Sequence, residues 1–199
     1  TINHLNVIWQ FLKRKRNYGE SKRLLKYIKK SFTVTDFEQL KALKTDILIT
    51  VTNLSKNEAE YKSIHECTYD EFCEWIWISS NYIPFMSLVL KDGFDYGDGG
   101  FSSLVPLRQA IIRGATEIDV IVLETEKTID KITIGKNPFS LLIDLFRIEL
   151  DQIEKHDILL GKLSAEDNNV KLNIYYTPIN LTHNALIFNK KRMKEWWKS

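Results

Sequence analysis

The sequence predicts one α/β domain with a largely parallel central sheet flanked by helices. With 199 residues, 44% of them hydrophobic, the chain is long enough to bury one substantial core. Three apolar segments rich in β-branched residues, at 47–51, 118–123 and 170–178, have the composition of buried strands. Segments with helical spacing separate them, and this alternation is typical of a parallel sheet.

The first third of the chain predicts helices followed by a strand pair. Apolar residues recur at helical spacing in 4–16 and again in 20–32. Thr35 or Asp36 is then the expected N-cap of a short helical turn. Residues 60–66 alternate between apolar and polar, so they predict a return strand antiparallel to the strand at 47–51.

The middle of the chain combines a capped helix with a tight hairpin. Thr68 followed by Glu71 is a capping-box pattern, which begins a helix that runs to Ser80. Trp75 and Trp77 lie in this helix and are expected to be core residues. The Asp92-Gly93 pair predicts a two-residue turn between two short strands.

Two further helices and a terminal helix complete the prediction. Residues 104–114 have Pro106 in the first turn and Gly114 at the C′ position. Residues 137–163 form a long amphipathic pattern. Residues 189–199 form a short basic helix whose apolar stripe suits either packing on the domain or contact with a membrane surface.

Charge is concentrated at the two ends of the chain. The net charge is +2 overall, but residues 1–30 hold nine Lys or Arg against one Glu, and 189–199 hold five against one. Such ends suit a solvated helix face, an anionic lipid surface or nucleic acid, and only charge supports the nucleic-acid hypothesis. We therefore expect no nucleic-acid partner. No apolar run approaches the roughly 18 residues that span a bilayer.

Cysteine and histidine spacing argues against a metal or redox site. Cys67 and Cys73 have five residues between them, a spacing that matches neither a zinc pair nor a C-x-x-C motif. The four histidines have no ligand spacing. We expect free thiols, no metal and no cofactor, and thiol usage together with a missing secretory signal favours a cytoplasmic location.

Asp98 is the strongest candidate for chemistry. It follows a short strand, precedes a helix and is flanked by Gly97, Gly99 and Gly100. In open α/β sheets, ligands collect at the carboxyl ends of strands, where a carboxylate can act as a general base. Asp and Gly also dominate turns for conformational reasons alone. The pattern by itself leaves both interpretations open.

Residues 78–123 resemble the second catalytic block of the patatin-like phospholipases, and 45–64 look like the family's strand, turn and return strand. The features of 78–123 that match in order are Ser79-Ser80, Ile83-Pro84-Phe85, Asp98-Gly99-Gly100, Pro106, Gly114-Ala115 and the apolar run 118–123. The resemblance covers 45–123 well and the rest of the chain only loosely.

The resemblance implies an acyl hydrolase with a Ser–Asp dyad acting on phospholipid or another lipid ester. Asp98 would be the base, with Gly99, Gly100, Ser79 and Ser80 lining the substrate site. The implied fold is a three-layer patatin-like domain, of which residues 1–199 form the C-terminal part without the N-terminal βαβ unit. A membrane contact through the basic ends would suit such a substrate.

The chain departs from the family at the nucleophile. The family's serine lies in G-x-S-x-G at a strand-to-helix elbow, and no such pentapeptide occurs in this sequence. Ser102 and Ser103 are close to Asp98 but lack this elbow. The serine is therefore expected outside this chain, and the chain alone is expected to be inactive. The alternative is a non-catalytic patatin-like scaffold that binds a lipid or a protein partner.

Overall fold

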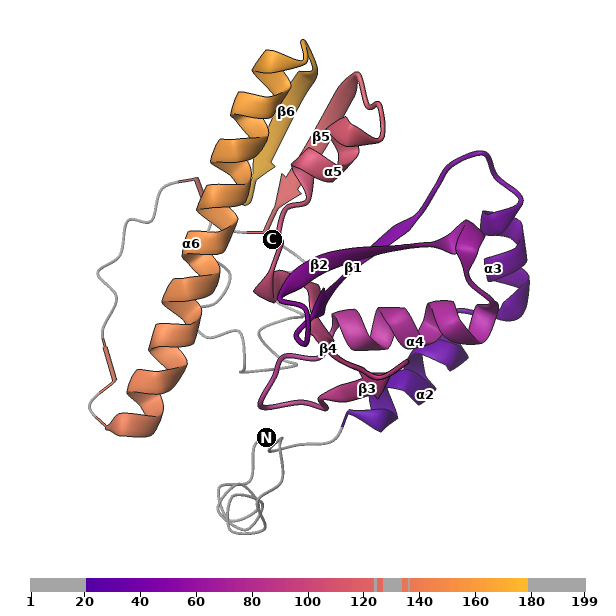
Figure 1. The fold of residues 1–199 in the computed structure, drawn as a ribbon, viewed down its shortest axis with the longest axis horizontal. Coiled ribbons are helices and arrows are strands. Elements are labelled where there is room, and N and C mark those ends of the chain that lie inside the picture. The colour runs from indigo at the N-terminus through magenta and orange to yellow at the C-terminus, as the bar shows by residue number, and fades with distance from the viewer. Residues whose placement is uncertain (1–20, 124, 127–133, 136, 179–199) are drawn as a thin grey trace.

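The computed structural model describes residues 21–123, 125–126, 134–135 and 137–178, which form a mixed α/β arrangement (Figure 1). Helices and strands alternate only in part, because the first four strands form hairpins. In chain order the elements are α2 Lys22–Ser31, α3 Val34–Lys41, β1 Leu48–Asn53, β2 Glu58–Ser63, η1 Ile64–Glu66, α4 Tyr69–Ser79, β3 Val89–Lys91, β4 Phe94–Asp98, η2 Gly99–Phe101, α5 Leu107–Ile112, β5 Glu117–Val122, α6 Pro138–Asp167 and β6 Lys171–Tyr176.

The larger sheet is antiparallel, which corrects the expectation of a largely parallel central sheet. Its four strands lie in the order β2-β1-β4-β3, and each neighbouring pair is antiparallel. The apolar run at 47–51 was expected in a parallel sheet because its composition is that of a buried strand. Burial does not encode strand direction, however, and the short turns after β1 and β3 impose antiparallel pairing.

A second sheet of the described residues is parallel and has two strands. β5 pairs with β6 from Glu117 opposite Lys171 to Val122 opposite Tyr176. The long helix α6 lies between them in the chain and beside them in space (Figure 1). This is the crossover connection that parallel strands need, so the parallel prediction is correct for these two strands.

Several local signals are confirmed. Thr68 and Glu71 form the reciprocal capping box of α4, and Gly114 adopts φ +88 just beyond α5. Asp92 and Gly93 both have positive φ, as a type I′ turn requires.

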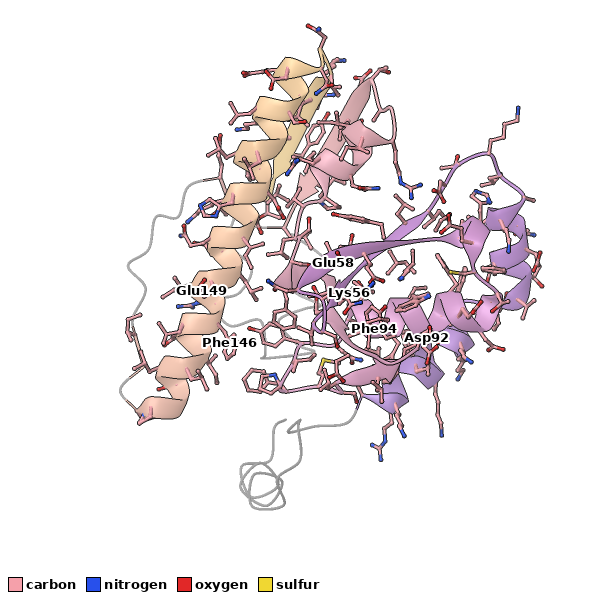
Figure 2. All side chains as sticks on the ribbon, viewed as in Figure 1. Lys56, Glu58, Asp92, Phe94, Phe146 and Glu149 are labelled. Atoms are coloured by element: carbon pink, nitrogen blue, oxygen red, sulfur yellow. The ribbon has the colours of Figure 1, made fainter. Side chains whose placement is uncertain are left out.

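The turn between β1 and β2 is held to β4, because Lys56 Nζ lies 3.6 Å from Glu58 Oε1 and 4.7 Å from the centroid of the Phe94 ring (Figure 2).

Two helix starts differ from the prediction. The N-cap of α3 is Thr33, which forms a capping box with Asp36, and not Thr35 or Asp36. Thr33 is the preferred N-cap because its capping box with Asp36 satisfies two backbone N–H groups at once. Pro106 is the N-cap of a shorter α5 and precedes its first turn. The expected helices at 4–16 and 189–199 lie outside the described residues.

The described residues bury two hydrophobic clusters. α4 covers one face of the antiparallel sheet, and α2 packs on α4 (Figure 1). Trp75 and Trp77 belong to this first cluster, each 6% exposed, as predicted. The second cluster lies between α5, α6 and the parallel sheet, with Leu107 and Ile158 at its centre. The turn η2 packs against both β1 and α6, so it lies where the two clusters meet.

None of the helices in the described residues is both long and apolar enough to cross a bilayer.

Replacing Phe37 by alanine tests the first cluster. Phe37 is 1% exposed, and its ring lies within 6.4 Å of the rings of Phe32, Tyr69 and Phe72, measured between centroids. We expect Phe37→Ala to lower the free energy of unfolding by about 3 to 5 kcal/mol, because the cavity cannot collapse fully. Urea denaturation followed by circular dichroism measures the loss. Val34→Ala on the same helix is the control, since Val34 is 53% exposed, and an equal loss there would contradict the assignment.

Candidate active site around Asp98

A cavity of about 410 Å³ lies beside the D-G-G turn. It brings together all five residues predicted for the site. Its lining combines apolar side chains with hydroxyls and one carboxylate, a common composition for a small-molecule site. The lining consists of Leu48, Ile49, Thr50, Ile76, Ser79, Ser80, Asp98, Gly99, Gly100, Ser103 and Leu104.

The backbone of Asp98 is fixed from both sides. It is the last residue of β4 and lies opposite Val51 of β1. Its N–H donates to the Asn81 carbonyl at 3.1 Å, and its own carbonyl accepts from the Thr52 hydroxyl at 2.7 Å. With both backbone groups paired, the direction of the side chain is set by the turn that follows.

The Asp98 carboxylate is half-buried in the cavity wall. Its Oδ1 accepts a hydrogen bond from the Gly100 N–H at 2.8 Å, which makes Asp98 the N-cap of η2. Burial raises the pKa of the Asp98 carboxyl above its ordinary value, and the Gly100 hydrogen bond opposes part of that rise. No lysine or arginine of the described residues forms an ion pair with it.

Gly99 is required by a close approach of the turn to β1. A β-carbon added at Gly99 would overlap the backbone carbonyl of Thr50, which the sheet holds in place. At Gly100 the nearest atoms would be Leu104 Cδ2 at 3.0 Å and Asp98 Oδ1 at 3.2 Å, both in side chains. Any substituent on Gly100 therefore presses on the carboxylate itself.

Most of the serine hydroxyls near Asp98 already lie within hydrogen-bond distance of another group of the protein. Ser102 Oγ lies 2.8 Å from the Thr52 hydroxyl, and Ser103 Oγ lies 3.4 Å from Asp157 of α6. Ser80 Oγ donates to the Ile76 carbonyl one turn earlier in α4, at 2.8 Å. Ser79 lines the cavity as a half-buried residue at the last position of α4. None of these serines stands on a strand-to-helix elbow.

Four positioning residues were missed by the sequence analysis. Thr52 and Asn81 hold the backbone of Asp98, and Asp157 accepts from the Val105 N–H at 3.0 Å, which anchors the chain after the turn. Tyr82 stacks on Phe101 of η2 at 5.6 Å between ring centroids. Burial, and then the nearby Asp98 charge, raise the pKa of the Tyr82 phenol. Only Thr52 had a sequence signal, since it falls within the strand, turn and return strand at 45–64 that resemble the patatin-like family.

The other titratable candidates lie elsewhere. Cys67 and Cys73 are buried free thiols, and burial raises the pKa of each, so neither is activated. His65 follows β2 and His156 is on α6, while His4 and His183 fall outside the described residues. Within 21–178, apart from its undescribed positions, no three His, Cys, Asp or Glu side chains gather as a metal site would require.

Comparisons with protein-family models and with curated proteins found no match to this chain. The resemblance to the patatin-like family therefore stays a prediction.

The buried carboxylate gives a pH-dependent stability that can be measured. A raised pKa means that the folded protein keeps its proton to higher pH than the unfolded chain, whose aspartate pKa is about 3.9. The native state then binds more protons, so stability falls as pH rises from about 4 through the folded pKa. Asp98→Asn keeps an acceptor for Gly100 N–H and removes the charge. We expect its stability relative to the parent to increase with pH above about 4.

Urea midpoints of parent and Asp98→Asn between pH 3.5 and 8 give this difference directly. Asp92→Asn is the matched control, because Asp92 is exposed in a turn that asparagine also adopts. Parallel stability curves for the parent and Asp98→Asn would contradict the burial of the carboxylate.

Replacing Gly99 and Gly100 by alanine, one at a time, distinguishes the glycine that the fold requires from the one that only borders the site. Gly99→Ala should lower the free energy of unfolding by about 1 to 3 kcal/mol, because a backbone carbonyl cannot move aside. Gly100→Ala should cost less, since only side chains must shift. Thermal unfolding of the two variants side by side measures the contrast, and equal losses would refute the close approach to Thr50.

Proposed function

We propose that this chain is the C-terminal part of a patatin-like serine acyl hydrolase with a three-layer α/β fold. Asp98 is the base of a Ser–Asp dyad, the serine lies outside this chain, and the substrate is a phospholipid or another lipid ester. One observation carries the proposal: a half-buried aspartate at the end of a strand faces a cavity, and burial raises its pKa.

The raised pKa suits a general base. A carboxylate with an ordinary pKa is a weak base at neutral pH, and a rise toward neutrality strengthens proton transfer in the transition state. In the first half-reaction, the serine O–H proton passes to Asp98 while the serine oxygen attacks the ester carbonyl. The proton then goes to the leaving alcohol as the acyl-enzyme forms. In the second half-reaction, a water molecule gives a proton to Asp98 as it attacks the acyl-enzyme. The proton then returns to the serine oxygen as the free acid is released.

The cavity lining supports an apolar acyl group. Its apolar lining residues are Leu48, Ile49, Ile76 and Leu104, and Ser79 and Ser80 line it from the end of α4. An acyl chain would lie along the leucine and isoleucine side chains, with its ester near the carboxylate. Gly99 and Gly100 line the same cavity next to the carboxylate. Contact with a membrane surface through the basic ends, and a cytoplasmic location, belong to the same proposal.

A second candidate is a patatin-like scaffold without catalysis, which binds a lipid or a protein partner. A specific observation favours it: the D-G-G turn has a structural role of its own. Asp98 caps η2 through Gly100, and Gly99 permits the packing of the turn on β1. Those two contacts explain the D-G-G motif by its role in the fold, with no catalytic role for Asp98.

Ester hydrolysis by the protein joined to its serine-bearing segment tests the first candidate. We expect Asp98→Asn to lower kcat for a lipid ester by about 10²- to 10⁴-fold, the range of general-base catalysis. Labelling of the serine by a fluorophosphonate should fall in parallel. Asp92→Asn should retain activity. An upstream segment without G-x-S-x-G, or an Asp98→Asn variant with parental activity, would favour the scaffold.

A further inference from the structure

The helix α6 carries a row of exposed leucines on the side away from its own core contacts. It is 30 residues long, and its C-terminal half lies beside β5 and β6 while its N-terminal half extends past the end of β6 (Figure 1). Large apolar side chains with close to half their surface in water are uncommon in such a regular row. Six leucines are between 40% and 55% exposed: Leu141, Leu142, Leu145, Leu159, Leu160 and Leu163.

Helix geometry places these leucines on one face of α6, about 100° wide. Leu141, Leu142 and Leu145 are each followed, 18 residues later, by Leu159, Leu160 and Leu163, and 18 residues are five full turns at 3.6 residues per turn. The two groups therefore face the same direction, roughly 27 Å apart along the helix axis. They form what we call the leucine stripe.

The opposite side of α6 is the one that packs on the rest of the chain. Ile158 and Ala165 are 8% and 3% exposed, and Gly161 lies against Leu107 of α5. At 100° per residue, these three positions lie roughly opposite the leucine stripe. The stripe is thus not part of either hydrophobic cluster of the described residues.

We propose that the leucine stripe is the interface of a homodimer, in which α6 packs antiparallel on α6 of a second copy. The two-fold axis passes near Gln152. This position is midway between Leu141 and Leu163, and also midway between Leu145 and Leu159. An antiparallel pair therefore sets each of these leucines against a leucine of the other copy, as a self-complementary two-fold interface requires.

The polar residues between the two leucine groups favour this partner and this direction. Glu149 and His156 are exposed and lie on either side of the midpoint. At 100° per residue they are about 20° apart around the helix, on the same face as the leucine stripe. Antiparallel pairing sets Glu149 against His156 of the second copy, where an imidazole N–H can donate to the carboxylate. Parallel pairing would set Glu149 against Glu149. A lipid surface would instead set the Glu149 carboxylate against acyl chains, which offer no hydrogen-bond donor. The proposal goes beyond the proposed function and does not depend on the role of Asp98.

Charge substitution at one matched pair of positions tests both the dimer and its direction. Leu145→Glu and Leu159→Lys should each raise the dissociation constant of the full chain by at least about tenfold, because each sets a charge against leucine. The double variant Leu145→Glu/Leu159→Lys should recover the dimer, since every glutamate then meets a lysine of the other copy. Sedimentation equilibrium measures the constant, and circular dichroism checks folding.

Leu90→Glu is the matched control, because Leu90 is 70% exposed on β3 and should leave the dissociation constant unchanged. A parent chain that stays monomeric at about 100 μM would overturn the proposal. Weakened single variants without recovery in the double variant would also overturn it, because the antiparallel register would be wrong. A monomer that floats with phosphatidylglycerol vesicles through the leucine stripe would assign this surface to a membrane instead.

Discussion

The contact between Gly99 and the carbonyl of Thr50 is the constraint on which the rest of the site depends. It brings the turn after β4 against β1 more closely than any side chain would allow. Because β4 is already paired with β1, the position of the turn follows from the sheet register. The Asp98 backbone is therefore held by hydrogen bonds to Asn81 and Thr52, and its carboxylate is held by the hydrogen bond that Oδ1 accepts from the Gly100 N–H.

The same turn joins two parts of the molecule. On one side it rests on β1 and the cluster around α4, and on the other Asp157 of α6 accepts from the chain just after it. An ion pair between Arg113 and Asp46, at 2.7 Å, links the two parts a second time. The Asp98 carboxylate is half-buried at this junction, and burial is the cause of its raised pKa.

The arrangement also separates two surfaces with different physical character. The Asp98 cavity is lined partly by hydroxyls and one carboxylate, and its geometry is set by backbone contacts. The leucine stripe is on the outward side of a single long helix and needs no special backbone geometry. Catalysis or ligand binding at the first would be altered by substitutions in the turn, whereas association through the second would not. The two proposals can therefore fail or succeed independently.

The sequence by itself determined the elements and the position of the candidate site. The Thr68 capping box, the Asp92-Gly93 turn and the five clustered residues around Asp98 were all predicted, because they depend on short-range chemistry and local spacing. The antiparallel pairing of β1 with β2 was also predicted, whereas the antiparallel pairing of β1 with β4 and the partners of Asp98 were decided by tertiary structure alone. Thr52, Asn81 and Asp157 reach the turn from 46, 17 and 59 positions away in the numbering. No local pattern records such contacts, since they arise only when the two clusters pack around the turn.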